Sequence, residues 1–340
     1  MRHFSAALAL LSLSFLTWTE AGTARAEAGP SFQFRPDDHA PIGVMGDHIH
    51  KKGEWMLSYR FAYMRMKGNR DGTRRLSNQE VLQDFMVTPT DMDMYMHMFG
   101  AMYAPTDWVT VMITLPWIQK SMDHLTGMGQ GFTTTTNEIG DFKTMGLFRL
   151  FENEHHEAHL NFGMSWPTGP ILATDETPAG SVVLPFPMQT GSGTFDMIPG
   201  LTYNGKSDRL SWGAQVLGTY RIGQNTADYT ASDRVDFSSW LAVPWTNWIS
   251  TSGRVAVHWW SDYGGDQVRA PPPPTIPTAR PDLRGGTSID LLGGVNLYVP
   301  LGPLGRHRFA IEAGAPVEQW LDGPQLETDW KVIVGWQKAF

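Results

Sequence analysis

Apolar and polar residues alternate along most of this chain, in runs that are separated by breaks. Alternation with a period of two predicts β-strands with one apolar and one polar face, and the 3.6-residue period of an amphipathic helix is nearly absent. We count twelve runs that fit the strand pattern. The predicted strands cover residues 54–66, 91–104, 108–119, 139–151, 157–166, 195–204, 209–222, 234–243, 247–260, 287–299, 306–315 and 328–340.

The segments between these runs are alternately short and long. The short ones cover residues 104–107, 152–156, 205–208, 244–246 and 300–305, and the long ones cover residues 67–90, 120–138, 167–194, 223–233, 261–286 and 316–327. Short turns at one end and long loops at the other are typical of bacterial transmembrane barrels, and an even strand number returns the C-terminus to the short-turn side. The sequence therefore predicts an all-β fold, a closed antiparallel transmembrane β-barrel of about twelve strands with short periplasmic turns and long extracellular loops.

Both ends of the chain carry features of an exported outer-membrane protein. After Arg2, an apolar stretch over residues 6–18 leads to a small-x-small site at residues 24–26, which predicts a signal peptide over residues 1–26. The last predicted strand ends on Phe340 and resembles the C-terminal signal that the barrel-assembly machinery binds. We therefore expect a barrel over residues 54–340 in the outer membrane of a Gram-negative bacterium, surrounded by lipid and lipopolysaccharide.

The two faces of each predicted strand should meet different surroundings. One face is apolar in most runs and should contact lipid, and the other carries charges of both signs and should line the lumen. Such charges either fill a narrow lumen with salt bridges or line an aqueous path, and the sequence leaves both open. The residues that we expect to line the lumen and set selectivity are Arg60, Asp93, His97, Asp141, Lys143, Arg149, Arg221, Arg254, Asp290 and Lys331.

One predicted strand contains a ladder of methionines. In TDMDMYMHMFGAMYA, residues 90–104, Met occupies every second position from Met92 to Met98. The opposite face carries Asp93 and His97, and a charge near the middle of the bilayer costs about 2–4 kcal/mol. We therefore expect the charged face to line the lumen and the methionines to contact lipid.

Met and His also gather outside this strand, because 13 of the 18 methionines lie between Met45 and Met128. Thioether and imidazole groups together suit copper. A copper site is therefore one hypothesis for the N-terminal segment and the loop after residue 120, and a plug or sealing strand with solvated histidines is the other. The candidate metal ligands are His39, Met45, His48, His50, Met122 and His124.

Composition excludes several classes of function. The net charge is −8, which disfavours binding to nucleic acid, and the chain has no Cys and hence neither disulfides nor thiolate sites. Barrel phospholipases need a Ser–His–Asn set on the lipid-facing side, and no convincing set is present. We expect no enzymatic activity and no cofactor, apart from the copper of the alternative.

Three stretches carry a resemblance to a known family: residues 38–73 (DHAPIGVMGDHIHKKGEWMLSYRFAYMRMKGNRDGT), residues 85–117 and residues 121–127. Together they resemble the outer-membrane transporter family named for the meta-pathway of phenol degradation. The resemblance implies a closed barrel and passage of small apolar or aromatic compounds, and it carries no site residues.

We therefore expect an outer-membrane channel or transporter for small solutes, with residues 27–53 as a periplasmic gate or plug. A copper-binding or copper-linked outer-membrane protein and a non-conducting structural barrel are the alternatives.

Overall fold

The computed structural model describes residues 35–340 except 266–270, 273–274 and 300–306. Contacts divide the chain into two units, residues 1–31 and 32–340, and all of the described residues belong to the second. The predicted signal peptide, residues 1–26, lies outside the described residues, as does the predicted turn at residues 300–305. In the described part of the chain, no helix is both long and apolar enough to cross a membrane.

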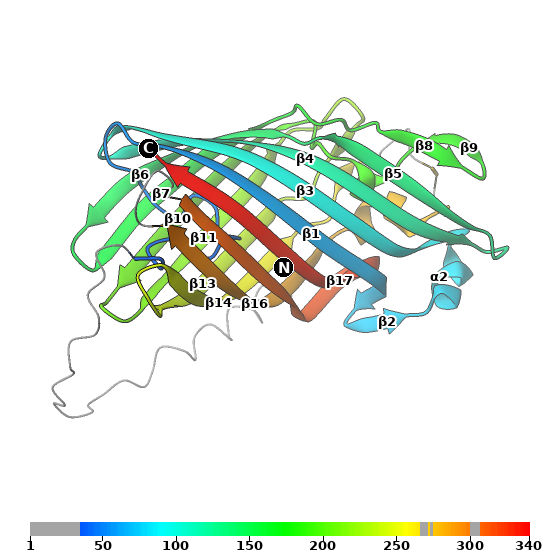
Figure 1. The fold of residues 1–340 in the computed structure, drawn as a ribbon. Coiled ribbons are helices and arrows are strands. Elements are labelled where there is room, and N and C mark those ends of the chain that lie inside the picture. Colours follow the sequence, from blue (N-terminus) through cyan, green and yellow to red (C-terminus); the bar gives the residue numbers. More distant parts are fainter. Residues whose placement is uncertain (1–34, 266–270, 273–274, 300–306) are drawn as a thin grey trace. The chain divides into compact units, whose positions relative to one another are not determined.

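In the part of the chain that the structure describes, eleven strand elements form one closed antiparallel ring, because the last element, β17, pairs with the first, β1 (Figure 1). Two further strands, β2 (Arg74–Leu76) and β5 (Gly131–Ile139), lie outside this ring and pair with β1 and β4. In ring order the elements are β1 (Trp55–Gly72), β3 (Val87–Thr106), β4 (Val109–Thr126), β6 (Phe142–Glu152), β7 (His156–Trp166), β10 (Phe195–Lys206), β11 (Ser211–Ile222), β13 (Arg234–Pro244), β14 (Ile249–Trp260), β16 (Gly286–Val299) and β17 (His307–Ala339).

The 33-residue element β17 crosses the wall twice. Its first half pairs with β16 and its second half pairs with β1. Arg308 donates to Gln337 at 2.6 Å, although a straight strand would separate these residues by roughly 95 Å. The chain therefore folds back near Leu321, where both neighbours meet β17, so the wall has twelve crossings, which correspond to the twelve predicted runs.

The long connections contain structure of their own. Their elements are α2 (Asn78–Asp84), β8 (Thr174–Thr177), β9 (Gly180–Val183), η1 (Phe186–Met188), β12 (Tyr229–Thr230), β15 (Gly264–Gly265), η2 (Pro277–Ala279) and η3 (Pro281–Leu283). The helix begins at a capping box in which Ser77 and Glu80 bind each other's backbone amides. We place these connections at the outer end of the barrel, as in other bacterial barrels.

The prediction of loops over residues 67–90, 120–138 and 316–327 was partly wrong. β1, β3, β4 and β17 continue into these segments, and β5 pairs with the outer half of β4. Apolar alternation ends where the strands leave the membrane, but backbone pairing continues there because the amides and carbonyls still need partners.

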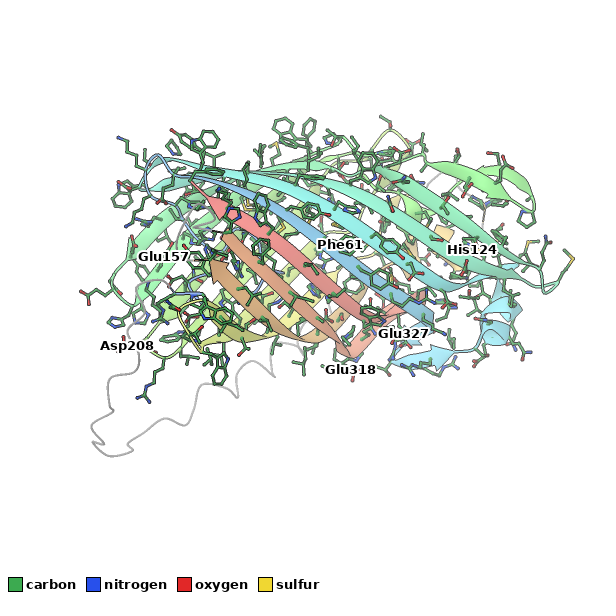
Figure 2. All side chains as sticks on the ribbon, viewed as in Figure 1. Phe61, His124, Glu157, Asp208, Glu318 and Glu327 are labelled. Atoms are coloured by element: carbon green, nitrogen blue, oxygen red, sulfur yellow. The ribbon has the colours of Figure 1, made fainter. Side chains whose placement is uncertain are left out.

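Large apolar side chains cover the outside of the wall (Figure 2). Examples on separate strands are Trp55, Phe99, Phe162, Leu241 and Val334, all of them at least 43% exposed. A closed sheet with an apolar outer surface satisfies every backbone group inside a lipid bilayer. The chain is therefore an outer-membrane β-barrel of a Gram-negative bacterium.

The predicted orientation of the methionine ladder was wrong. Directly paired residues of antiparallel strands point to the same face, and His97 pairs with Phe61 while Asp93 pairs with Arg65, all on the outer face. On the other face, Met92 and Met102 are only 4% exposed, whereas the neighbouring outward Phe99 is 52% exposed. Asp93 and His97 therefore lie outside the lumen, and the methionines line it.

Hydrogen-bonded partners make this orientation possible. Arg65 donates to Asp93 at 2.6 Å, and the Tyr63 hydroxyl donates to the same carboxylate at 2.5 Å. The Tyr59 hydroxyl lies 2.8 Å from a His97 ring nitrogen. The sequence-based prediction assumed an isolated charge, whereas cross-strand partners satisfy these groups at the outer face.

Single cysteines at Met98 and Phe99 will test this orientation. The chain has no native Cys, so each variant carries one site for a nitroxide label. We expect lipid-dissolved oxygen to relax the label at residue 99 strongly and the label at residue 98 weakly, because Met98 borders an internal cavity of about 270 Å³. Stronger relaxation at residue 98 than at residue 99 would show that the methionines face lipid.

Candidate functional site

The N-terminal segment lies inside the barrel. Its backbone accepts hydrogen bonds from inward side chains on five strands that are spread around the ring, and only the lumen can bring these donors together. The donors and acceptors are Arg60 and the Ile42 carbonyl (3.0 Å), Asn161 and Gly46 (2.9 Å), Gln215 and Met45 (2.9 Å), Ser250 and Pro36 (3.1 Å), and Arg308 and Ala40 (2.6 Å). We call residues 36–50 the plug segment.

Two glycines let the plug segment approach the wall closely. Gly46 has a φ of +63°, and its carbonyl lies 3.0 Å from the ring nitrogen of the fully buried His159. At Gly43, an added Cβ would lie 2.3 Å from a Glu312 oxygen and 2.4 Å from an Arg254 nitrogen. Larger side chains at either position would push the segment away from the wall.

A buried ion pair anchors the middle of the plug segment. Arg254 on β14 binds Glu312 on β17 through two contacts of 2.8 Å, and both side chains are at most 7% exposed. The same carboxylate accepts a hydrogen bond from the Gly43 amide at 3.1 Å. The pair therefore joins two strands of the wall to the plug segment.

Eight of the ten residues that we predicted to line the lumen lie on the inner face, and the exceptions are Asp93 and His97. Arg60 and Arg254 hold the plug segment and its anchor, and Arg149 pairs in register with the inward His159. Asp141, Lys143 and Arg221 line the 270 Å³ cavity. Asp290 and Lys331 form an ion pair on the inner wall.

Asp290 and Lys331 belong to a longer network of charges. His258 lies between Asp236 and Asp290, and its contact with Asp290 measures 3.3 Å. Arg234 binds Asp236 at 2.8 Å at the other end. Charges of both signs are thus paired along β13, β14, β16 and β17, so ion pairs connect the inner faces of these four strands.

The candidate metal ligands separate into three places. His39, His48 and His50 come together in the plug segment, with ring contacts of 3.3 and 3.2 Å. Met45 packs elsewhere in the lumen, and Met122 and His124 lie on the outer half of β4. Asp47, which was not among the predicted ligands, lies 3.0 Å from His48 and completes a compact group with His39.

Burial changes the ionisation of this group. It lowers the pKa of His39 well below its usual value, and the neighbouring His48 adds to this effect. Burial also lowers the pKa of His50 to about 4. Burial alone would raise the pKa of the Asp47 carboxyl, but His48 and His39 hold that pKa well below its usual value. His39 and His50 are therefore neutral near pH 7, and Asp47 is ionised.

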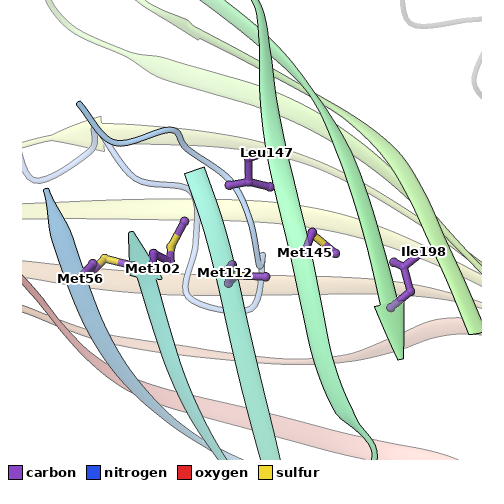
Figure 3. Packing of buried hydrophobic residues seen from close by; sticks show 6 residues of the cluster. All are labelled: Met56, Met102, Met112, Met145, Leu147 and Ile198. Carbon is purple, nitrogen blue, oxygen red and sulfur yellow. The ribbon is translucent and has the colours of Figure 1, made fainter. Parts of the chain in front are cut away.

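Methionines from consecutive strands form two clusters on the inner wall. The plug-side methionine cluster contains Met56, Met102, Met112, Met145, Leu147 and Ile198, with Met45 packed against it (Figure 3). The outer methionine cluster contains Met92, Met122, Leu184 and Met188, with Met66 and Leu326 against it. The cross-strand pairs Met66–Met92–Met122 and Met56–Met102–Met112–Met145 produce this arrangement.

An apolar cavity of about 680 Å³ lies beyond the outer methionine cluster. We call it the outer pocket, and it is formed by the end of α2, the β4–β5 hairpin, the β8–β9 hairpin and residues near Ile276. Leu184 belongs to both the outer pocket and the outer methionine cluster. Its apolar lining includes Leu82, Phe85, Met86, Val87, Met128, Phe132, Val182, Leu184, Pro185 and Ile276.

Two buried polar atoms in the lining of the outer pocket have no hydrogen-bond partner among the described residues. They are Nδ1 of His124 and the hydroxyl oxygen of Thr134. The His124 ring stacks on Phe132 with 4.7 Å between the ring centres. Both atoms are buried behind the surface of the pocket, so a bound molecule would reach them only if the lining residues around them shifted. The sequence did not reveal this pocket, since its walls come from four separate connections.

The chain is similar in structure to the COG4313 outer membrane channel from Pseudomonas putida F1, with a TM-score of 0.59 at 10% identity over 87% of this chain and 99% of that chain. The KdgM porin is less similar, with a TM-score of 0.38 at 10% identity over 84% of this chain and 99% of that chain. OprD from Pseudomonas aeruginosa has a TM-score of 0.33 at 6% identity over 90% of this chain and 97% of that chain. Neither a protein-family model nor a curated protein matches the sequence. The first similarity supports the barrel fold, and the resemblance to the phenol-degradation family stays a prediction.

Proposed function

We propose that this barrel is a channel for small, largely apolar molecules, which bind first in the outer pocket. The outer pocket is the observation that carries the proposal. Its volume of about 680 Å³ lies in the range of small-molecule sites, and apolar side chains dominate its lining.

The two unpartnered polar atoms narrow the chemistry of the solute. A molecule that fills the outer pocket and, after a shift of the lining residues, also binds His124 or Thr134 needs an apolar body with a hydrogen-bonding group. A small phenol has this form, which agrees with the aromatic compounds implied by the family resemblance.

The inner face of β3 supplies a route from the outer pocket toward the periplasm. Met92 lies in the outer methionine cluster, Met96 and Met98 border the 270 Å³ cavity, and Met102 lies in the plug-side methionine cluster. Methionine is unbranched and adapts to irregular apolar partners, so this wall suits a solute that moves along it. The plug segment closes the periplasmic part of the route.

Binding of 4-nitrophenol to the barrel in lipid nanodiscs tests the proposal. We expect one molecule per chain and an affinity at least about tenfold lower in Leu184→Trp, because the larger indole would occupy part of the pocket. A tenfold loss corresponds to about 1.4 kcal/mol. Val317→Trp is the matched control, since Val317 lies on the outer face and is 56% exposed. Equal affinities for the Leu184→Trp variant and the unmodified chain would contradict the assignment of the outer pocket.

A further inference from the structure

Three side chains of the plug segment place atoms that can bind a metal close to one another. Nδ1 of His39 lies 3.3 Å from Nδ1 of His48. Asp47 places one oxygen 3.0 Å from the His48 nitrogen and the other 3.9 Å from the His39 nitrogen. One ligand atom from each residue thus lies within 4.8 Å of the others.

This spacing fits a tetrahedral metal ion. Two imidazole nitrogens that bind one ion at about 2.0–2.1 Å lie about 3.3 Å apart in a tetrahedron. The observed separation of the two Nδ1 atoms is also 3.3 Å. Imidazole and carboxylate ligands suit Zn(II) and Cu(II), and the absence of thiolates in this chain disfavours softer sites.

Neighbouring groups hold the ligands in position. Nε2 of His48 lies 3.2 Å from Nε2 of His50, and Nδ1 of His50 lies 3.5 Å from Glu54. If Nε2 of His48 donates to Nε2 of His50 and Nδ1 of His50 donates to Glu54, the Nδ1 lone pair of His48 is left for a metal. The Ala40 amide donates to Asp47 at 3.0 Å and orients the carboxylate.

We propose that His39, Asp47 and His48 bind one divalent transition-metal ion, Zn(II) or Cu(II), which fastens the plug segment in the lumen. The ion would join residues 39 and 48, and the loop between them carries the contacts of Ile42, Gly43 and Gly46 with the wall. Metal affinity would therefore stabilise the closed arrangement of this loop. The proposal does not depend on which solute the barrel carries.

Titration of the metal-free, full mature chain in nanodiscs with Zn(II), and separately with Cu(II), tests the site. We expect one ion per chain and a Cu(II) spectrum with two imidazole nitrogens. His48→Gln should lower the affinity at least about 100-fold, and His50→Gln about tenfold, because His50 only orients a ligand. Heat-dependent gel mobility reports whether each variant is folded.

His155→Gln is the matched control, because His155 is exposed in the turn between β6 and β7 and lies beside His156. We expect it to leave the affinity unchanged. The proposal fails if the unmodified chain binds less than one ion, if His48→Gln binds as well as the unmodified chain, or if His155→Gln removes the binding. The first and last outcomes are decisive even if the plug variants do not fold.

Bilayer recordings test the fastening. Saturating Zn(II) should reduce channel openings at least about tenfold relative to a chelator in the unmodified chain, and should have no effect in His48→Gln. Bound metal with unchanged openings would overturn the fastening of the plug segment.

Discussion

A chain that lacks residues 36–50 conducts ions through planar bilayers at a level at least about tenfold above that of the full mature chain. This is the largest effect that we expect. A barrel of eight strands is filled by its own side chains, whereas sixteen or more leave an aqueous channel. A wall with twelve crossings lies between these cases, and here an extra stretch of chain occupies the interior.

The contacts of the plug segment explain the size of this effect. Its backbone is held by Arg60, Asn161, Gln215, Ser250 and Arg308, so its removal leaves these polar side chains facing an open lumen. Water and ions would then solvate them.

Deletion of residues 71–74 at the tip of the β1–β2 hairpin is the control, because it shortens the chain without touching the plug segment or the lining of the outer pocket. We expect the control barrel to open as rarely as the full chain. A silent barrel after deletion of residues 36–50 would show that the inward connections close the lumen by themselves, and it would exclude the plug role.

Glu312→Ala should lower the free energy of unfolding by about 3–5 kcal/mol, because it leaves the buried Arg254 without its partner. The variant also loses the hydrogen bond from the Gly43 amide, so we expect more frequent channel openings. Urea unfolding in liposomes measures the first effect and bilayer recording the second. Unchanged stability would mean that water reaches Arg254 and replaces the carboxylate.

The double variant Arg254→Met, Glu312→Leu separates the two effects. Replacing both members of a buried ion pair with apolar residues of similar size is often neutral or stabilising. We therefore expect near-normal stability, but openings as frequent as in Glu312→Ala, because the anchor for Gly43 is still absent. If the double variant opened as rarely as the unmodified chain, Glu312 would have no part in holding the plug segment.

Much of the metal group could be anticipated from the sequence, but its geometry could not. His48 and His50 are two residues apart, and their proximity follows from the sequence alone. His39 joins them only because the chain turns between Ala40 and Asp47 and is held to the wall on both sides. Met122 and His124 were grouped with them by composition, yet β4 carries them to the outer half of the barrel.

The sequence by itself determined the closed barrel, its twelve crossings and the end at which the chain finishes. These follow from the two-residue period, the alternation of turn lengths and the terminal strand, all of which are local signals. Only the tertiary structure decided which face of β3 meets lipid. From the sequence of β3 alone, either face could contact lipid or line the lumen. The pairing of Phe61 with His97 and of Arg65 with Asp93 places the face of His97 and Asp93 outside the lumen. The sequence predicted a gate or plug at residues 27–53, but only the tertiary structure decided the contacts of the plug segment and the walls of the outer pocket, because the partners come from strands and connections that are far apart in the sequence.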